Sequence, residues 1–298
     1  MDKFCLIINR SKDKNFEVTN KVVNYIKENN RECVLLECHD GVCSSLYTDT
    51  NTIPKDTECI IVLGGDGTIL HAAHDLIDID VPILGINIGT LGFLADIEVH
   101  NIYDALDSLF NDDYTLEHRM MLEGCVKRNN EKLYVSNALN EVVIERSGFS
   151  RIISLSVFVN GQFANRYRGD GILISTPTGS TGYNLSAGGP VVKPDNQVII
   201  LTPICAHSLS SRSIILNASD EILVKVETSK KTQDDEVIAT YDGYESKLLH
   251  ADDLIEIRKS NKTTKFIKFK SNNFFETLRT KIGNSEDYYI WRMQDKVK

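Results

Sequence analysis

A glycine-rich segment, Gly64-Gly65-Asp66-Gly67-Thr68, carries the sharpest chemical signal in the chain, and it directly follows an apolar run at 59–63. Glycine lets a backbone turn tightly and approach a ligand closely, and amide groups at the start of a following helix suit phosphate. Asp66 is unusual there because a carboxylate repels phosphate. It would serve a metal ion, or accept the proton of a hydroxyl that attacks phosphorus. The alternative is a tight turn in which Asp66 caps a helix.

The same segment differs from two common nucleotide-binding patterns. It lacks the Walker A sequence G-x-x-x-x-G-K-[ST], and it is not the G-x-G-x-x-G fingerprint of dinucleotide-binding enzymes. A hydride-transferring enzyme is therefore disfavoured. His71 lies in the helix that should follow and could reach a phosphate, although a histidine on a helix surface is the plainer interpretation.

A second constellation occupies residues 169–190, where the apolar run 172–175 leads into a loop of Ser, Thr, Gly and Pro residues. Small hydroxyl side chains and glycines supply hydrogen-bond donors and close backbone approach, which suits ribose and phosphate oxygens. A flexible linker is the alternative. Pro177, Tyr183 and Pro190, framed by apolar strands, favour a binding loop instead.

A third and weaker signal is Asn140 beside Glu141, just before the apolar run VVI. A carboxylate accepts hydrogen bonds from the hydroxyls of a diol, and an amide both donates and accepts, so the pair could clamp a ribose. On its own this dipeptide is common, and a turn at the end of a strand is the alternative.

The elements that must position these residues change in kind along the chain. In the first third, apolar runs alternate with helical stripes, which predicts parallel βαβ units. The predicted strands are 4–9, 33–37, 59–63 and 82–87, the predicted helices are 14–29, 68–76 and 100–110, and 39–57 is predicted as a loop.

After about residue 112, strands dominate, and Asn129-Asn130 and Asn160-Gly161 carry hairpin signals. Further strands are predicted at 198–202, 221–226, 237–241, 253–259 and 264–270, and a helix at 273–282. We therefore expect two domains. An N-terminal α/β domain, Rossmann-like with a parallel sheet, comprises 1–111, with 272–298 packing back on it. A β-rich, antiparallel, sandwich-like domain comprises 112–271.

The composition narrows the class of protein. With 42 acidic and 33 basic residues, the chain carries a formal charge of -9, which disfavours nucleic acid or an anionic membrane as the partner. Its apolar runs are too short for a membrane span or a secretory signal, so we expect a cytoplasmic protein. Seven cysteines without a C-x-x-C pair are expected to be free thiols rather than zinc ligands.

Taken together, these motifs resemble those of the NAD kinase (ATP-NAD kinase) family. The long STPTGST block with NE and LGFL is specific to that family, whereas GGDGT is shared with lipid kinases and phosphofructokinase-type kinases. The resemblance implies a two-domain fold and the transfer of a phosphoryl group from ATP to NAD, which gives NADP. The matching segments, in the family's order, are GGDGT at 64–68, GINIGTLGFL at 85–94, NE at 140–141, DG at 170–171, STPTGSTGYNLSAGGP at 175–190, PICAHSLSSR at 203–212 and YDG at 241–243.

The resemblance also implies roles for single residues. Asp66 is similar to the aspartate that takes the proton from the 2′-hydroxyl of the adenosine ribose. Phe93 resembles a residue near the adenine, and Asn140 and Glu141 resemble those that bind the NAD ribose. The implied phosphate loop is Gly64, Gly65, Gly67 and Thr68. The remaining implied dinucleotide contacts are Gly67, His71, Arg151, Arg168, Asp170, Thr178, Thr181, Gly182, Tyr183, Asn184, Leu185, Ser186, Cys205 and Tyr244.

The family's properties imply NAD and ATP as substrates, Mg²⁺ or another divalent cation with the ATP, and a homodimer or homotetramer. No residue is expected to be a protein ligand of a metal. Whether polyphosphate replaces ATP, and whether NADH is accepted, stay open. The chain departs from the family at Gly182, where alanine is usual, and at Tyr244, where many members have glutamine.

Two rival functions remain. A lipid kinase of the GGDGT type would leave the NE and STPTGST motifs unexplained. A sensor that binds NAD(P) without consuming ATP would not need Asp66.

Overall fold

The computed structural model describes residues 1–38, 48–89, 92–95, 97–148, 152–208, 211–227, 237–269 and 274–282. The chain divides into two compact units, of which unit 1 is Met1–Glu117 with Lys265–Lys298 and unit 2 is His118–Thr264. The sequence pattern placed these boundaries near 112 and 271. The structural boundaries instead fall inside two long strands, β6 (Thr115–Arg128) and β17 (Leu254–Lys268), where no turn marks the passage.

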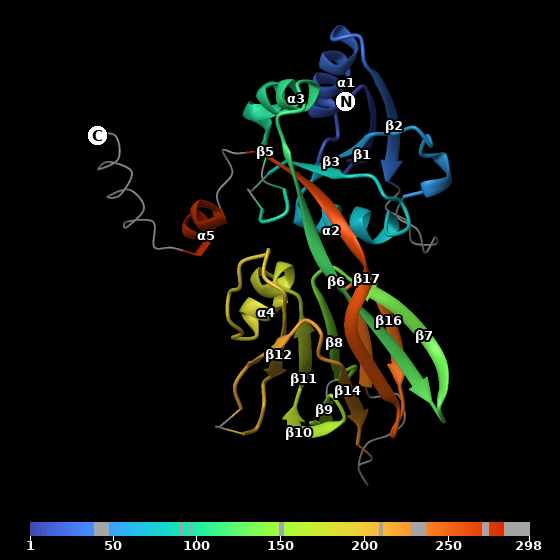
Figure 1. Ribbon diagram of the computed structural model, residues 1–298, viewed down its shortest axis with the longest axis vertical. Coiled ribbons are helices and arrows are strands. Elements are labelled where there is room, and N and C mark those ends of the chain that lie inside the picture. The colour runs from blue at the N-terminus through green and yellow to red at the C-terminus, as the bar shows by residue number, and fades with distance from the viewer. Residues whose placement is uncertain are drawn as a thin grey trace, which may run out of the picture. The chain divides into compact units, whose positions relative to one another are not determined.

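Unit 1 is built on a parallel sheet whose strands pair in the order β2-β1-β3-β4, with Phe266 of β17 beside Ile83 of β4 (Figure 1). Its middle strands each carry an unbroken run of buried apolar residues because helices cover both faces. The strands are β1 (Lys3–Asn9), β2 (Glu32–Cys38), β3 (Cys59–Gly64), β4 (Ile83–Asn87) and the short β5 (Ile97–Glu98).

Helices α1 (Glu17–Glu28), α2 (Asp66–Asp75) and α3 (Ile102–Phe110) each bury one apolar stripe against this sheet. Helices α1 and α3 share a core with alternate residues of β1 and β3, and α2 covers the other face (Figure 1). Helix α1 begins later than predicted because its N-cap, Phe16, has a left-handed backbone with φ of 56°. The Asp13 carboxylate accepts the N–H groups of Val18 and Thr19 in the first turn. The remaining elements are the 3-10 helices η1 (Thr50–Thr52) and η2 (Val99–Asn101) and helix α5 (Phe274–Ile282).

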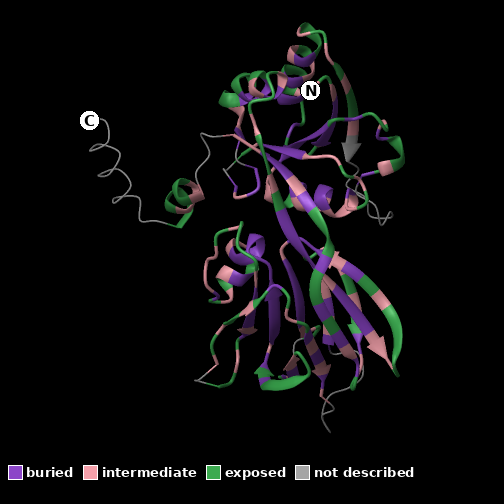
Figure 2. Cartoon of the chain, viewed as in Figure 1, coloured by how far each residue is buried: buried purple, intermediate pink, exposed green. Residues whose placement is uncertain are grey.

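Unit 2 is an antiparallel sandwich, as the sequence predicted. One sheet has the strand order β13-β12-β11-β8-β15-β16. The other contains β10-β9-β14-β17 together with β6 and β7, and the two share one apolar core (Figure 2). The bounds are β7 (Glu131–Ala138), β8 (Glu141–Arg146), β9 (Ile153–Val159), β10 (Gln162–Gly169), β11 (Gly171–Ser175), β12 (Val198–Ile204), β13 (Ile214–Asn217), β14 (Ile222–Val226), β15 (Val237–Tyr241) and β16 (Glu245–Leu249).

Two predicted hairpins are confirmed by their backbone geometry. Asn129 and Asn130 have φ of 52° and 66°, and Asn160 and Gly161 have φ of 50° and 75°, the left-handed pairs that a tight antiparallel turn requires. The prediction of two strands at 253–259 and 264–270 is wrong, because β17 is one strand that continues through the polar residues 260–263. Strands β13 and β16 were not predicted. In the described part of the chain, no helix is long and apolar enough to cross a membrane.

Candidate active site

The carboxyl ends of the parallel strands of unit 1 bring polar residues to one edge of its sheet. Strand β1 has β2 on one side and β3 on the other, so the order of the strands reverses between β1 and β3, where ligands bind in open α/β sheets. Asn9 ends β1, and its Nδ2 donates a hydrogen bond to Thr68 Oγ1 at 3.2 Å, across this point. Sequence analysis overlooked Asn9, although its place at the end of an apolar strand was visible.

The GGDGT segment joins β3 to α2 at this edge. Gly64 is the last residue of β3, and a Cβ there would meet Thr68 Oγ1 at 2.4 Å, so Thr68 can pack only against glycine. Gly65 is the N-cap, and the helix begins at Asp66, two residues earlier than predicted. A Cβ on Gly65 or Gly67 would meet nothing within 4 Å among the described residues. The outer side of the loop is therefore open, beside the amide groups of a helix N-terminus.

Asp66 does not cap its own helix, so the plain structural interpretation of this residue is wrong. Its Oδ2 accepts the N–H of Phe93 at 2.7 Å, and its Oδ1 accepts those of Leu94 and Ala95, each at 3.0 Å. A Cβ on Gly92 would lie 1.8 Å from Oδ1. The carboxylate is thus held in one orientation by three consecutive main-chain amides, and Oδ2, which has one donor, can accept another.

Two further predicted residues lie in unit 1. Phe93 is half-buried, and its ring centroid lies 6.2 Å from that of Phe274 in α5. His71 is half-buried in α2, and burial lowers its pKa, an effect that the charge of Asp75 opposes. His71 is therefore biased towards the neutral form. This suits hydrogen bonding better than charge pairing with a phosphate.

In unit 2, the structure brings Asn140, Glu141 and Gly182 together. Glu141 is only 7% exposed, and burial, with a smaller contribution from the charge of Asp242, raises its pKa to about 8. A Cβ on Gly182 would lie 3.5 Å from Glu141 Oε2 and 3.6 Å from Asn140 Nδ2. Within the described chain, Glu141 Oε2 and Asn140 Oδ1 are buried and have no hydrogen-bond partner. Two buried oxygens without donors mark a place for the hydroxyls of a ligand.

The loop after β11 is not flexible but folded, with a 3-10 helix, Thr178–Thr181, and a short helix α4, Tyr183–Ser186. The side chain of Asn184 is fully buried and braces the loop. Its Nδ2 donates to Ser180 O and Pro190 O, and its Oδ1 accepts from Thr202 Oγ1 at 2.7 Å. Its amide is therefore used inside the protein, and any ligand contact from this residue falls to its backbone.

Thr178 is buried, and its hydroxyl accepts a hydrogen bond from Nη1 of Arg119 at 3.3 Å. Arg119 is only 3% exposed and was missed in sequence analysis, since nothing in the residues around it indicates a contact with a loop so distant in sequence. The remaining predicted loop residues, Thr181, Leu185 and Ser186, are half-buried or exposed.

A second group of predicted residues surrounds Tyr183, which is 39% exposed. The Tyr183 hydroxyl hydrogen-bonds with Glu145, and burial together with the charges of Glu145, Cys205 and Asp170 raises its pKa. Asp170 accepts from Arg146 Nε at 2.7 Å. Cys205 is exposed and has a left-handed backbone, with φ of 45°. The structure thus brings together Tyr183, Asp170 and Cys205.

Three predicted residues remain in unit 2. Arg168 is exposed on β10, and its carbonyl accepts the N–H of His207. Tyr244 closes the turn between β15 and β16 through a bond from its N–H to Tyr241 O. Arg151 lies outside the described residues.

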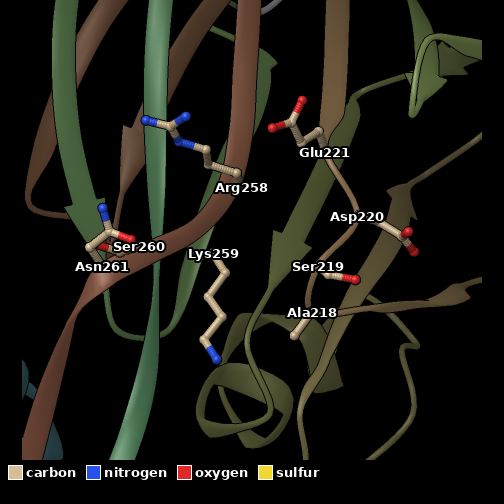
Figure 3. A pocket seen from close by; sticks show the side chains of 8 residues that line it. All are labelled: Ala218, Ser219, Asp220, Glu221, Arg258, Lys259, Ser260 and Asn261. Carbon is tan, nitrogen blue, oxygen red and sulfur yellow. The ribbon is translucent and has the colours of Figure 1, made fainter.

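One open surface pocket of about 220 Å³ lies elsewhere on unit 2, and none of the predicted site residues lines it (Figure 3). Three of its charged side chains have protein partners: Arg258 binds Glu123, Lys259 Nζ donates to Gln197, and Asp220 accepts from Asn160. We therefore do not assign it to the site.

The sequence matches family models and known proteins along nearly its whole length. Residues 17–114 match the family model described as the ATP-NAD kinase N-terminal domain, and residues 139–269 match the ATP-NAD kinase C-terminal domain. The NAD kinase of Lachnoclostridium phytofermentans is 49% identical over 95% of this chain and 100% of its own length. The NAD kinase of Thermoanaerobacter pseudethanolicus is 42% identical over 95% of this chain and 99% of its own length.

Two solved structures share the fold. Yeast NADH kinase complexed with NADH superposes with a TM-score of 0.83 and 26% identity, covering 95% of this chain and 88% of that one. An NAD kinase from Archaeoglobus fulgidus in complex with ATP superposes with a TM-score of 0.72 and 26% identity, covering 93% and 96%. With both domain models matched and relatives identical at 40% or more along nearly the whole sequence, the chain belongs to the ATP-NAD kinase family.

Proposed function

We propose that Asp66 is the proton acceptor when this chain phosphorylates NAD to NADP with ATP, the activity that its family carries out. The observation that carries this assignment is the geometry of the Asp66 carboxylate. It is fixed by three amides, one of its oxygens retains room for a donor, and the open glycines Gly65 and Gly67 adjoin it at a helix N-terminus. A hydroxyl and a phosphate chain can therefore meet at one place.

The chemistry asks little basicity of Asp66. A carboxylate is a far weaker base than a sugar alkoxide, so it does not remove the proton of the 2′-hydroxyl in advance. It orients that hydroxyl and accepts its proton late, as the bond to the γ-phosphorus forms. Because most of the rate then comes from positioning, a carboxylate held rigidly by main-chain amides suits the task.

For NAD, we assign the ribose diol to Asn140 and Glu141. Both present a buried oxygen without a partner in the described chain, and Gly182 lies beside them. The loop with Thr178, Thr181 and Ser186 then lies around the dinucleotide, and the exposed ring of Tyr183 offers a flat apolar face for a base.

A divalent cation fits this site as part of the substrate MgATP. Among the described residues, no three His, Cys, Asp or Glu side chains are grouped to hold a metal, and the Asp66 carboxylate is engaged by amides. Mg²⁺ commonly binds through substrate phosphates and water with few protein ligands. The ion would offset charge on the transferred phosphoryl group, while the amides of the GGDGT segment hold the phosphate oxygens.

We also propose a cytoplasmic homo-oligomer, a dimer or a tetramer. Free thiols at Cys5, Cys33, Cys59, Cys125 and Cys205 are compatible with a reducing compartment. Light scattering during gel filtration tests the oligomer directly.

The activity is tested by coupling NADP formation to an NADP-specific dehydrogenase, with purified protein, NAD, ATP and Mg²⁺. We expect wild-type turnover and an almost inactive Asp66→Asn variant that still binds NAD. A folded wild-type protein that binds NAD but forms no NADP, with ATP or with polyphosphate, would indicate the sensor function. Turnover of a diacylglycerol or sphingosine substrate instead of NAD would indicate the lipid kinase.

A further inference from the structure

Asp242 occupies a tight turn next to the Asn140–Glu141 pair. Asp242 and Gly243 have φ of 52° and 68°, and Tyr244 N–H donates to Tyr241 O at 2.9 Å, so they are the central residues of a tight turn that connects β15 to β16. Aspartate tolerates the left-handed conformation better than most residues. The turn aims its carboxylate back at the start of β8.

The carboxylate of Asp242 accepts three consecutive main-chain N–H groups. Leu139 donates to Oδ2 at 2.7 Å, and Asn140 and Glu141 donate to Oδ1 at 2.8 and 2.9 Å. In return, the N–H of Asp242 donates to Glu141 O at 3.0 Å. Only an ionised carboxylate provides acceptors for three donors without presenting a hydrogen of its own, and such charge-assisted bonds are the stronger kind.

The opposite side of the same segment is held by the loop after β11. Thr176 Oγ1 donates to Leu139 O at 2.6 Å, and Thr176 N donates to Asn140 O at 2.8 Å. A Cβ on Gly179 would lie 2.4 Å from Asn140 O, so the loop packs there without a side chain. The donors of residues 139–141 thus go to Asp242 and the acceptors of 139 and 140 go to Thr176.

We propose that Asp242 is a positioning residue for NAD, which fixes the backbone of residues 139–141 and so aims the Asn140 and Glu141 side chains at the ribose diol. This rests on the proposed function, since it takes those two residues as the ribose ligands. A displacement of about 1 Å in the groups that position a substrate can lower the rate on the order of a hundredfold. The hydrogen bonds that fix residues 139–141 therefore matter for how NAD is held.

The charge of Asp242 adds a second, separable effect. Burial comes first in raising the pKa of Glu141, and the Asp242 charge adds to it. The other elements around Glu141 present Ser175, its partner on β11, and Gly182 from the loop, neither of which carries a charge. Tyr241 pairs with Val142 and packs in the core on the opposite face of β8. Removing the Asp242 charge therefore lowers the pKa of Glu141. Because the ionised carboxylate is the better acceptor for ribose hydroxyls, the acid limb of NAD affinity should move to lower pH.

The test uses Asp242→Asn in the full chain, with NAD affinity measured calorimetrically from pH 5.5 to 9, about two units either side of neutrality, and with KM and kcat from the coupled assay. We expect the KM for NAD to rise on the order of tenfold, with a smaller change in kcat, and the acid limb to shift downward. Asp242→Ala should raise KM further. Asp252→Asn is the matched control, since Asp252 is also a turn aspartate with positive φ in unit 2, paired with Lys225, and should leave KM and the pH profile unchanged.

A lowered melting temperature with unchanged KM and unchanged pH profile would overturn the proposal. If Asp242→Asn does not fold, Thr176→Val takes its place, because it releases Leu139 O from the other side of the segment, and an unaltered KM in that variant would equally overturn it. If the wild-type protein binds NAD but forms no NADP, the proposed reaction is wrong. The calorimetric comparison of NAD affinity between the wild type and Asp242→Asn still tests the role of Asp242. A wild-type protein that binds no NAD would sink both.

Discussion

Asp66 in unit 1 and Asp242 in unit 2 make the same hydrogen-bond pattern in different surroundings. Each precedes a glycine, and each carboxylate accepts three consecutive main-chain N–H groups, two on Oδ1 and one on Oδ2. Asp66 is the first residue of a helix and faces open glycines. Asp242 sits in a hairpin turn beside the buried Glu141. The same pattern can thus hold a reactive carboxylate still in one place and aim neighbouring side chains in another.

The largest expected effect is at Asp66. Asp66→Asn removes the proton acceptor and places an NH₂ group against one set of amide donors, so we expect kcat to fall by about 10²–10⁴-fold. NAD affinity should change little, because the ribose ligands lie at Asn140 and Glu141. Steady-state kinetics and calorimetry on the same preparation check this. A kcat within a few-fold of the wild type would rule out Asp66 as the base.

The amide cradle around Asp66 can also be disturbed without replacing Asp66 itself. In Gly92→Ala the new Cβ would lie 1.8 Å from Asp66 Oδ1, so the segment must shift. We expect a loss of about tenfold to a hundredfold in kcat and about 1–3 kcal/mol in stability.

Gly67→Ala is the companion variant in the same loop. Its Cβ meets nothing within 4 Å among the described residues, and alanine favours a helix by about 0.5–1 kcal/mol over glycine. It should therefore be at least as stable as the wild type, yet raise the KM for ATP if phosphate approaches the open side. Thermal unfolding measures the effect on stability, and ATP titrations in the coupled assay measure the effect on the KM for ATP. An equal loss of stability in Gly92→Ala and Gly67→Ala would contradict the expectation that only the Cβ at position 92 meets other atoms of the described residues.

The next effect concerns the pH dependence of stability at Glu141. The folded protein keeps this proton up to a pKa of about 8, whereas glutamate in an unfolded chain titrates near about 4.3. The folded state then binds more protons between these values, so the free energy of unfolding should decrease as pH rises through that window. Glu141→Gln should remove this decrease, a difference on the order of 4 kcal/mol at pH 8, while raising the KM for NAD. Urea unfolding at pH 5 and pH 8 measures this for both proteins. An equal change in unfolding free energy between the two pH values in the wild type and in Glu141→Gln would contradict the prediction.

The smallest effect is expected at Gly182. An alanine Cβ would lie 3.3 Å from Gly179 O and 3.5 Å from Glu141 Oε2, which a small shift accommodates, and φ of Gly182 is -91°, outside the left-handed region that favours glycine. Alanine reduces the conformational freedom of the unfolded chain, which would add about 0.4–1 kcal/mol to the free energy of unfolding. The close contact with Gly179 O offsets this gain. We expect kcat/KM for NAD within about threefold of the wild type. A loss of a hundredfold would show that NAD fills this space.

Sequence analysis predicted features that depend on neighbouring residues. The apolar strands of unit 1, the two asparagine hairpins and the chemical character of the GGDGT and STPTGST segments were all visible locally. The two aspartate cradles were not, because their partners lie 27 to 29 residues away for Asp66 and 101 to 103 residues away for Asp242. Asn184 and Arg119 are similar cases, since burial and not residue type decides that their side chains serve the loop.

The division of unit 1 into two chain segments has a consequence for synthesis on the ribosome. Unit 2 is one uninterrupted stretch, but unit 1 completes its sheet only with the end of β17, where Phe266 and Ile267 are buried. A growing polypeptide therefore holds everything needed for the later-encoded sandwich before the earlier-encoded half has its last strand. During synthesis the N-terminal domain normally folds first. Here unit 1 cannot complete its sheet until the end of β17 has been made. Premature termination anywhere before about residue 268 would leave the first-made half with an exposed sheet edge, a target for quality control.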